Sequence, residues 1–434
     1  MALNAGVQAL VLAGGKGSRS LNPDLPKILQ QVGPESRILD LHLENLAAAG
    51  VHNVAFLVNH GASIVESAVN RALARFPNLT ATFIHDEGHV STFSIVKNAI
   101  GFLPKAEEYL LVLGDTVISA PVDLYLSLRR NRGAGAAVLA HPNLHISDSD
   151  RVWFDRDYMA TGFCRKSTQS DDTLVGMTLP LTGLLLFTQS FFEGIGADEG
   201  DLTQIIAEHG VSTRDLSVIV ASHYFKDSGT PSRLARINSD YASGVLQRRG
   251  NANRPAIFID RDGTMLPDIG SQRTTLNDHE IPIDVAQAIR SVNEVGIPIC
   301  LVTNQPGIAK GEITFRQIYA ISNAISAVLE SHGAFLDDYA FCPHHPHGGF
   351  AGELPEFKIL CTCRKPATGM VDGLAVVHEL DIAKSFVIGD TERDSGLAQA
   401  AGASFLLASF DGHNGMATSR AIYSAVERIL SDHH

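Results

Sequence analysis

Short apolar runs alternate with longer segments of helical periodicity along the first half of the chain. The apolar runs cover residues 7–12, 54–58 and 110–113, and apolar residues recur at helical spacing over 39–49 and 64–76. A continuous apolar run is typical of a strand that is buried on both faces of a parallel sheet. Because such strands alternate with helices, the pattern predicts a doubly wound, Rossmann-like α/β domain.

The second half repeats this alternation with its own strands. Apolar runs at 256–259, 297–303 and 386–388 are separated by helical patterns at 283–294 and 315–332. We therefore expect a second doubly wound sheet, and an α/β fold class with two three-layer domains.

A polar and basic stretch, Q-R-R-G-N-A-N-R, separates the two patterns. Gly250 lies within this stretch and Pro255 follows it, and both residues interrupt regular structure. A chain of 434 residues is also too long for one ordinary core. The predicted organisation is a first domain over 1–242, a linker over 243–254 and a second domain over 255–434.

The composition is that of a globular protein, with 45% hydrophobic and 19% charged residues. The formal net charge of -13 argues against a general nucleic-acid surface, although a few local cations can still bind small anions. No apolar run is long enough to span a bilayer, and the first residues do not read as a signal peptide. We expect a cytoplasmic protein with no membrane partner, and the sequence leaves the oligomeric state open.

Polar residues stand at the ends of the predicted strands in the second half. Asp260 and Asp262 follow the first strand, Thr303 and Asn304 end the second, and Asp390 follows the third. Open α/β sheets bind their ligands at the carboxyl ends of the strands. Two carboxylates so close together repel, so they must share a cation or a proton. The pair is therefore a candidate nucleophile and acid.

The motifs D-R-D-G-T, T-N, a lysine and G-D-x-x-x-D occur in this order and resemble the haloacid dehalogenase superfamily of phosphohydrolases. The resemblance implies that Asp260 attacks phosphorus and forms an aspartyl phosphate. It implies that Asp262 protonates the leaving oxygen and later activates water. Thr303 and Lys365 would hold the phosphoryl oxygens.

The same resemblance implies a magnesium site. Mg²⁺ would be held by Asp260, the backbone carbonyl of Asp262 and Asp390, which would neutralise the repulsion between the carboxylates. Asp394 is expected to support the site without binding the ion directly.

Three of the five cysteines lie close to histidines in the second half. A C-x-H pair and a C-x-C pair provide four ligands: Cys342, His344, Cys361 and Cys363. Such a set fills a tetrahedral zinc site and leaves no position for water, so it indicates a structural Zn²⁺. The alternative is three buried thiols beside a surface histidine. The metal would fix the loop that carries Arg364 and Lys365 to the substrate.

This arrangement resembles the heptose 1,7-bisphosphate phosphatases and their relatives, the histidinol-phosphate phosphatase domains. The stretches T-N-Q-P-G-I-A-K-G and C-R-K-P-A-T-G-M favour the heptose branch, with Thr303, Asn304, Arg364 and Lys365 as substrate-binding residues. One departure is Thr391, where that branch commonly has lysine.

A glycine-rich turn follows the first predicted strand of the chain. It reads A-G-G-K-G-S-R and contains four candidate phosphate-binding residues: Gly14, Gly15, Gly17 and Ser18. Without side chains, the glycines let backbone N–H groups approach a phosphate. Arg19 can add a forked contact to phosphate oxygens, and Lys27 supplies a second cation. A plain tight turn is the alternative interpretation.

Together with D-L-P-K, L-G-D and K-D-S-G-T-P, this turn resembles the sugar-phosphate nucleotidyltransferases over roughly the first 240 residues. The resemblance implies that the loop and Arg19 hold a nucleoside triphosphate and that Lys27 contacts phosphate. Asp115 and Asp227 would bind Mg²⁺ between the reacting phosphates. Lys166 stands where that family has a sugar-contacting lysine, although the surrounding motif differs.

The two resemblances together imply a bifunctional enzyme of activated-heptose biosynthesis. The second domain would remove the C7 phosphate of D-glycero-D-manno-heptose 1,7-bisphosphate, and the first would join the 1-phosphate to a nucleotide, with guanosine as the expected base. Two alternatives stay open. The first domain is a non-catalytic nucleotide-binding module, or the phosphatase acts on another phosphomonoester such as histidinol phosphate.

Overall fold

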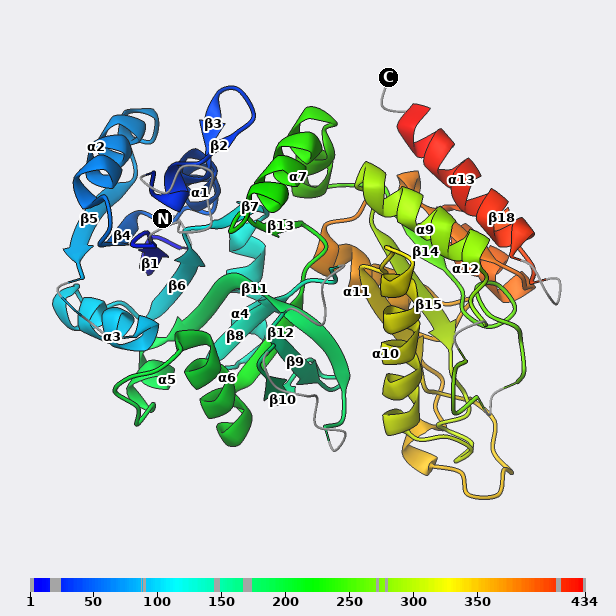
Figure 1. The fold of residues 1–434 in the computed structure, drawn as a ribbon. Helices are drawn as coiled ribbons and strands as arrows, with labels where there is room; N and C mark the ends of the chain where they lie inside the picture. Colours follow the sequence, from blue (N-terminus) through cyan, green and yellow to red (C-terminus); the bar gives the residue numbers. More distant parts are fainter. Residues whose placement is uncertain are drawn as a thin grey trace.

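The computed structural model describes residues 4–15, 25–86, 88, 91–143, 149–166, 174–270, 273–277, 280–410 and 415–431. Two α/β sheets lie side by side, one in each half of the chain (Figure 1). This confirms the α/β class. Within the described residues, no helix combines the length and the apolar character needed to cross a membrane.

The first half contains a nine-stranded sheet with the order β10-β9-β11-β6-β1-β4-β5, in which β8 pairs with β11 and β12 pairs with β8. Its strands are β1 (Val7–Leu12), β4 (Asn53–Val58), β5 (Thr80–His85), β6 (Glu108–Leu113), β8 (Ala136–Ala140), β9 (Arg151–Phe154), β10 (Ala160–Cys164), β11 (Met177–Thr188) and β12 (Leu216–Val220). Strands β6, β1, β4 and β5 are parallel, whereas β11 runs antiparallel to β6, β8 and β9. The sheet is therefore mixed.

Helices cover this sheet, and two short ribbons stand beside it. The helices are α1 (Ile38–Ala48), α2 (Ala62–Ala72), α3 (Thr92–Phe102), α4 (Val122–Arg132), α5 (Gln189–Glu193), α6 (Leu202–Thr213) and α7 (Pro231–Ala242), with 3-10 turns η1 (Lys27–Leu29) and η2 (Leu73–Arg75). The ribbons are β2 (Gln31–Val32) with β3 (Ser36–Arg37), and β7 (Thr116–Ser119) with β13 (Tyr224–Asp227).

The second half contains a parallel sheet with the order β16-β15-β14-β17-β18. Its strands are β14 (Ile257–Ile259), β15 (Ile299–Asn304), β16 (Asp338–Cys342), β17 (Phe386–Gly389) and β18 (Ser404–Leu407). Its helices are α9 (Ile283–Val295), α10 (Phe315–Ser331), α11 (Gly369–His378), α12 (Glu392–Ala401) and α13 (Met416–Ser431), with 3-10 turns η4 (Pro355–Phe357) and η5 (Ile382–Lys384).

The strand order reverses at β14, which pairs with β15 on one side and β17 on the other. Such a switch point leaves a crevice at the carboxyl ends of the strands, where α/β proteins bind ligands. Alternate residues of β14 enter opposite cores, since Ile257 and Ile259 pack in one cluster and Phe258 in the other. Burial on both faces fixes the register of the strand that leads to Asp260.

The segment 243–254 contains helix α8 (Val245–Gly250) and joins the two halves through buried arginines. Arg249 Nη1 donates to Asp337 Oδ1 at 2.5 Å and to the Ser222 carbonyl at 2.9 Å. Arg254 Nη2 donates to the His378 carbonyl at 2.6 Å. These bonds connect both halves through groups shielded from water.

Candidate functional sites

A buried ion pair lies at the carboxyl end of β14. The ammonium of Lys365 donates to Asp260 Oδ1 at 2.5 Å, to Asp394 Oδ1 at 2.6 Å and to the Val302 carbonyl at 2.9 Å. All three N–H groups of the ammonium therefore donate to protein acceptors. The backbone N–H of Asp260 donates to the Ile388 carbonyl at 2.9 Å, which ties this residue to β17.

Three carboxylates face one another around this lysine. Asp260, Asp390 and Asp394 each present an oxygen within 4.8 Å of the others. Gly263 allows the approach, because a Cβ there would lie 2.3 Å from Asp390 Oδ2 and its φ is +85°. One ammonium leaves the cluster with excess negative charge, and carboxylate oxygens are the ligands that Mg²⁺ prefers. The residues thus fit a divalent cation.

Burial dominates the ionisation of this cluster. It raises the pKa of Asp260 to about 6, with Lys365 opposing the rise and Asp394 adding to it. Burial also raises the pKa of Asp390. For Lys365, burial works to lower the pKa, but Asp260 and Asp394 outweigh it and the pKa is raised. The electrostatics therefore keep the lysine charged and favour a cation or a proton among the carboxylates.

The carboxylate of Asp262 is bound by polar neighbours of its own. Arg261 donates to Asp262 Oδ2 through Nε at 3.0 Å and Nη2 at 2.7 Å, and Gln305 Nε2 donates to it at 3.0 Å. Arg273 Nε lies 3.6 Å from Oδ1. These three partners of Asp262 were not predicted from the sequence. Arg261 stands inside the D-R-D motif and Gln305 directly after T-N, so position alone could have indicated them, whereas Arg273 lies outside any motif.

The residues at the end of β15 hold the lysine loop. Asn304 Oδ1 accepts from the Lys365 backbone N–H at 2.9 Å, and Asn304 Nδ2 donates to the Lys365 carbonyl at 3.1 Å. The hydroxyl of Thr303 accepts from Gln305 Nε2 at 2.9 Å. Asn304 thus orients the backbone of the lysine, and Thr303 lies buried at the strand end.

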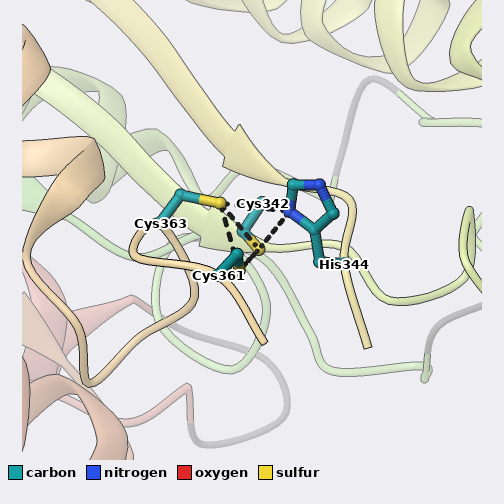
Figure 2. Close-up of side chains that lie close together, drawn as sticks. All are labelled: Cys342, His344, Cys361 and Cys363. Carbon is teal, nitrogen blue, oxygen red and sulfur yellow. Dashed lines mark hydrogen bonds between the residues drawn. The ribbon is translucent and has the colours of Figure 1, made fainter. Parts of the chain in front are cut away.

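Three sulfurs and one imidazole converge beside the end of β16 (Figure 2). The Sγ atoms of Cys342, Cys361 and Cys363 lie 3.2 to 3.6 Å apart, and His344 Nδ1 lies 3.6 Å from the first and 3.2 Å from the last. Zn–S bonds of about 2.3 Å in a tetrahedron place sulfurs about 3.8 Å apart. The four ligands therefore fit a closed metal site with little movement.

The cluster is joined directly to the loop that carries Arg364 and Lys365. Arg364 follows Cys363 in sequence, and its Nη1 donates to the His344 carbonyl at 3.2 Å. Lys365 comes next and reaches the carboxylates. A metal held by the four ligands would therefore fix the positions of both cations.

In the first half, a cavity of about 290 Å³ opens at the carboxyl ends of the strands. Gly14, Gly15, Lys27 and Asp115 are among the residues that line it. Lys27 Nζ lies 2.7 Å from Asp115 Oδ2. The predicted Gly17, Ser18 and Arg19 lie outside the described residues.

The two predicted metal-binding aspartates of this half come from adjacent segments. The backbone N–H and the hydroxyl of Ser228 donate to the Asp115 carbonyl at 2.8 and 2.9 Å. The carboxylate of Asp227 instead binds Arg233 and accepts from the Gly229 N–H at 2.5 Å. Each aspartate is thus near the other in the fold but paired with its own cation.

Two other observations concern the surroundings of this cavity. Asn59 and Asp86 line it, with Asn59 Nδ2 donating to Asp86 Oδ2 at 2.9 Å, and neither residue was predicted from the sequence. Lys166 is exposed, is not among the lining residues, and donates through its backbone N–H to Asp150 Oδ1 at 3.0 Å. These residues come after the ends of three different strands, and no local motif connects them.

Comparison with known proteins defines the class of each half. Residues 9–209 match the model of the MobA-like NTP transferase domain, and residues 362–421 match that of the HAD-hydrolase-like family. The chain is therefore an enzyme that combines a hydrolase domain with a nucleotidyltransferase domain.

Curated relatives define the family more closely. The D-glycero-beta-D-manno-heptose-1,7-bisphosphate 7-phosphatase of Rhodopseudomonas palustris is 36% identical over 157 residues, which cover 34% of this chain and 80% of the relative. The protein of the same name from Yersinia pestis is 39% identical over 147 residues, covering 34% and 76%. The chain belongs to the family of these heptose-bisphosphate phosphatases.

Solved structures resemble about half of the chain. A putative glucose-1-phosphate thymidylyltransferase from Bacillus anthracis covers 54% of this chain and 94% of its own, at 18% identity and a TM-score of 0.46. HddC from Yersinia pseudotuberculosis covers 54% and 99%, at 17% identity and a TM-score of 0.42.

Proposed function

We propose that this enzyme dephosphorylates D-glycero-D-manno-heptose 1,7-bisphosphate at C7 and then transfers a nucleotidyl group, GMP from GTP, to the resulting heptose 1-phosphate. The C7 step is assigned to the second half and the transfer to the first. The observation that carries the hydrolase assignment is the Lys365 ammonium bonded to both Asp260 and Asp394. The names of the family members support the choice of sugar.

In the proposed hydrolysis, an oxygen of Asp260 attacks phosphorus, and the bond from phosphorus to the C7 oxygen breaks. Asp262 donates a proton to that oxygen and then takes one from the water that cleaves the aspartyl phosphate. Lys365 and Thr303 hold the phosphoryl oxygens, and Arg364 binds the sugar phosphate. When bound to Asp260, the Asp262 carbonyl and Asp390, Mg²⁺ supplies positive charge against the phosphoryl group.

The proposed transfer uses the cavity in the first half. The loop of Gly14 and Gly15 and the ammonium of Lys27 hold the triphosphate. The 1-phosphate oxygen attacks the α-phosphorus and pyrophosphate leaves, so the chain's main task is to orient anions and offset their charge. Asp115 and Asp227 would hold the Mg²⁺ of this half.

Incubation with the bisphosphate, GTP and Mg²⁺ tests both steps in one tube. We expect inorganic phosphate first, then pyrophosphate and a GDP-sugar in equal amounts. Each other nucleoside triphosphate is assayed in parallel to test the base. Phosphate release with no nucleotide sugar, for every base and several sugar 1-phosphates, would refute the transfer.

A second function for the first half is nucleotide binding without turnover. The observation in its favour is that Asp115 and Asp227 are paired with separate cations. Calorimetry distinguishes the two functions. Nucleotide binding that Asp115→Ala leaves unchanged, without turnover, would support a regulatory module.

A further inference from the structure

One face of helix α10 is packed against the first half of the chain. Phe315, Tyr319 and Asn323 are spaced four residues apart and therefore share this face. Asn323 Oδ1 accepts from the Thr178 N–H and its Nδ2 donates to the Gly176 carbonyl, both at 3.0 Å. These two bonds join the helix to the backbone at the start of β11, beside which α10 lies in Figure 1.

Apolar side chains also form part of the contact between α10 and the first half. Tyr319 is 5% exposed and packs in the same cluster as Val152 and Phe154 of β9 and Ala160 of β10. A residue of the second half is thus part of a core of the first half. The segment formed by β9, β10 and the start of β11, here called the lobe, is firmly attached to the hydrolase domain.

The turn between β9 and β10 contacts the loop of residues 342–363, which carries the four candidate metal ligands and is here called the metal loop. The guanidinium of Arg156 lies 5.1 Å from the ring centre of Phe315 and 5.2 Å from that of Phe357, and the two rings are 5.4 Å apart. Guanidinium groups at this distance are attracted to the faces of aromatic rings. Arg156 therefore holds together a ring of α10 and a ring of the loop between the two ligand pairs.

Phe357 in turn supports the metal ligand. Its ring centre lies 5.9 Å from that of His344, and its carbonyl accepts from the His345 N–H at 3.1 Å. The His344 carbonyl accepts from Arg364 Nη1 at 3.2 Å. A continuous chain of contacts thus runs from Arg156 to Arg364, the cation proposed to bind the sugar phosphate.

We propose that the lobe of the transferase domain supports the metal loop of the hydrolase domain, with Arg156 as a positioning residue for dephosphorylation. Arg156 acts through Phe357 and His344 on the orientation of Arg364. The inference rests on the proposed hydrolase function but not on the choice of sugar, because metal retention is measured without substrate.

The experiment compares Arg156→Ala, Arg156→Lys and the control Arg290→Ala in the full-length, zinc-loaded protein. Arg290 is a suitable control because it is exposed on α9 and pairs with Glu294 one helical turn away. Zinc release to a chromogenic chelator is measured, together with kcat and KM for the bisphosphate and for p-nitrophenyl phosphate. Asn323→Ala removes the two hydrogen bonds between α10 and the start of β11, and so weakens the same domain contact independently of Arg156.

We expect Arg156→Ala to release zinc about two- to fivefold faster and to raise KM for the bisphosphate by a similar factor, with a smaller change in kcat. Arg156→Lys should recover part of both effects, since lysine keeps a cation above the rings. Asn323→Ala should also speed zinc release and raise KM for the bisphosphate. Arg290→Ala should leave both zinc release and KM unchanged.

Unchanged zinc release and KM in both Arg156→Ala and Asn323→Ala would overturn the proposal. An equal loss in Arg156→Lys and Arg156→Ala would contradict the ring contact as its basis. Failure of the sugar assignment looks different. In that case the wild-type protein hydrolyses p-nitrophenyl phosphate but not the bisphosphate. Zinc is still released faster from Arg156→Ala and Asn323→Ala than from Arg290→Ala.

Discussion

Each half of the molecule pairs a lysine with an aspartate at the end of a strand, and the two pairs differ in burial. Lys365 and Asp260 have side chains that are 3% and 9% exposed, whereas Lys27 and Asp115 are 18% and 30% exposed. Lys365 also donates to a second carboxylate, that of Asp394, and to the Val302 carbonyl. The buried Lys365 is thus held by three protein acceptors, whereas the Lys27 pair is partly exposed. In the proposed reactions each lysine gives up a protein contact to bind phosphate.

This difference has a physical cause. A buried charge is tolerated only when it is paired and hydrogen-bonded, so the hydrolase groups hold one another in place. A partly exposed pair gains little from its contact and separates easily. We therefore expect substitutions at the two sites to differ in their effects on stability as well as on activity.

The largest expected effect is on phosphate release by Asp260→Asn. An amide cannot act as the nucleophile, so release should fall by about a thousandfold or more. Transfer to a supplied sugar 1-phosphate should stay within about twofold of the wild type, because the reacting groups of that step lie in the other half. Both rates are measured on the full-length protein, with the exposed Asp268→Asn as the control. Loss of both activities in Asp260→Asn would contradict independent sites.

The second prediction concerns stability. Lys365→Met leaves Asp260 and Asp394 buried without their cation, which should lower the free energy of unfolding by about 3 to 5 kcal/mol. Urea denaturation in the presence of a chelator measures this, with Lys384→Met, an exposed lysine, as the control. A loss as small as that of the control would mean that the carboxylates are stabilised by other groups.

The third prediction concerns the transferase half. Asp115→Asn removes a charge that would hold Mg²⁺ at the reacting phosphates, and transfer should fall by about a hundredfold while phosphate release is unchanged. Pyrophosphate formation and phosphate release are followed separately. Asp123→Asn, on the exposed side of α4, is the matched control. A full rate of transfer in Asp115→Asn would favour a metal held by other ligands.

The sequence predicted the hydrolase site better than its surroundings. Asp260, Asp390 and Asp394 stand at fixed distances from apolar runs, and parallel strands place such residues at one edge, so pattern alone brings them together. Arg249 and Arg254 show the opposite case. They lie in a polar stretch that suggests a linker, but their partners Ser222, Asp337 and His378 are distant in sequence.

The antiparallel course of β11 could not be predicted from the sequence for a similar reason. Its apolar run has the composition of a buried strand in either direction, and only its pairing with β6 and β9 decides the direction. Likewise, the contact between Arg156 and Phe357 depends on how two domains pack. Local periodicity carries no information about such pairings, because tertiary contacts determine them.

The smallest expected effect is that of Lys27→Met. It tests most directly whether the two lysine–aspartate pairs differ in role. The pair with Asp115 is partly exposed, so stability should change by no more than about 1 kcal/mol. If Lys27 leaves Asp115 to bind phosphate, its loss should weaken nucleoside triphosphate binding by about tenfold, the size of one charged hydrogen bond. Calorimetry with GTP and urea denaturation measure the two quantities on the same variant. A large loss of stability with unchanged binding would mean that Lys27 is structural, and the two lysine–aspartate pairs would then play the same role.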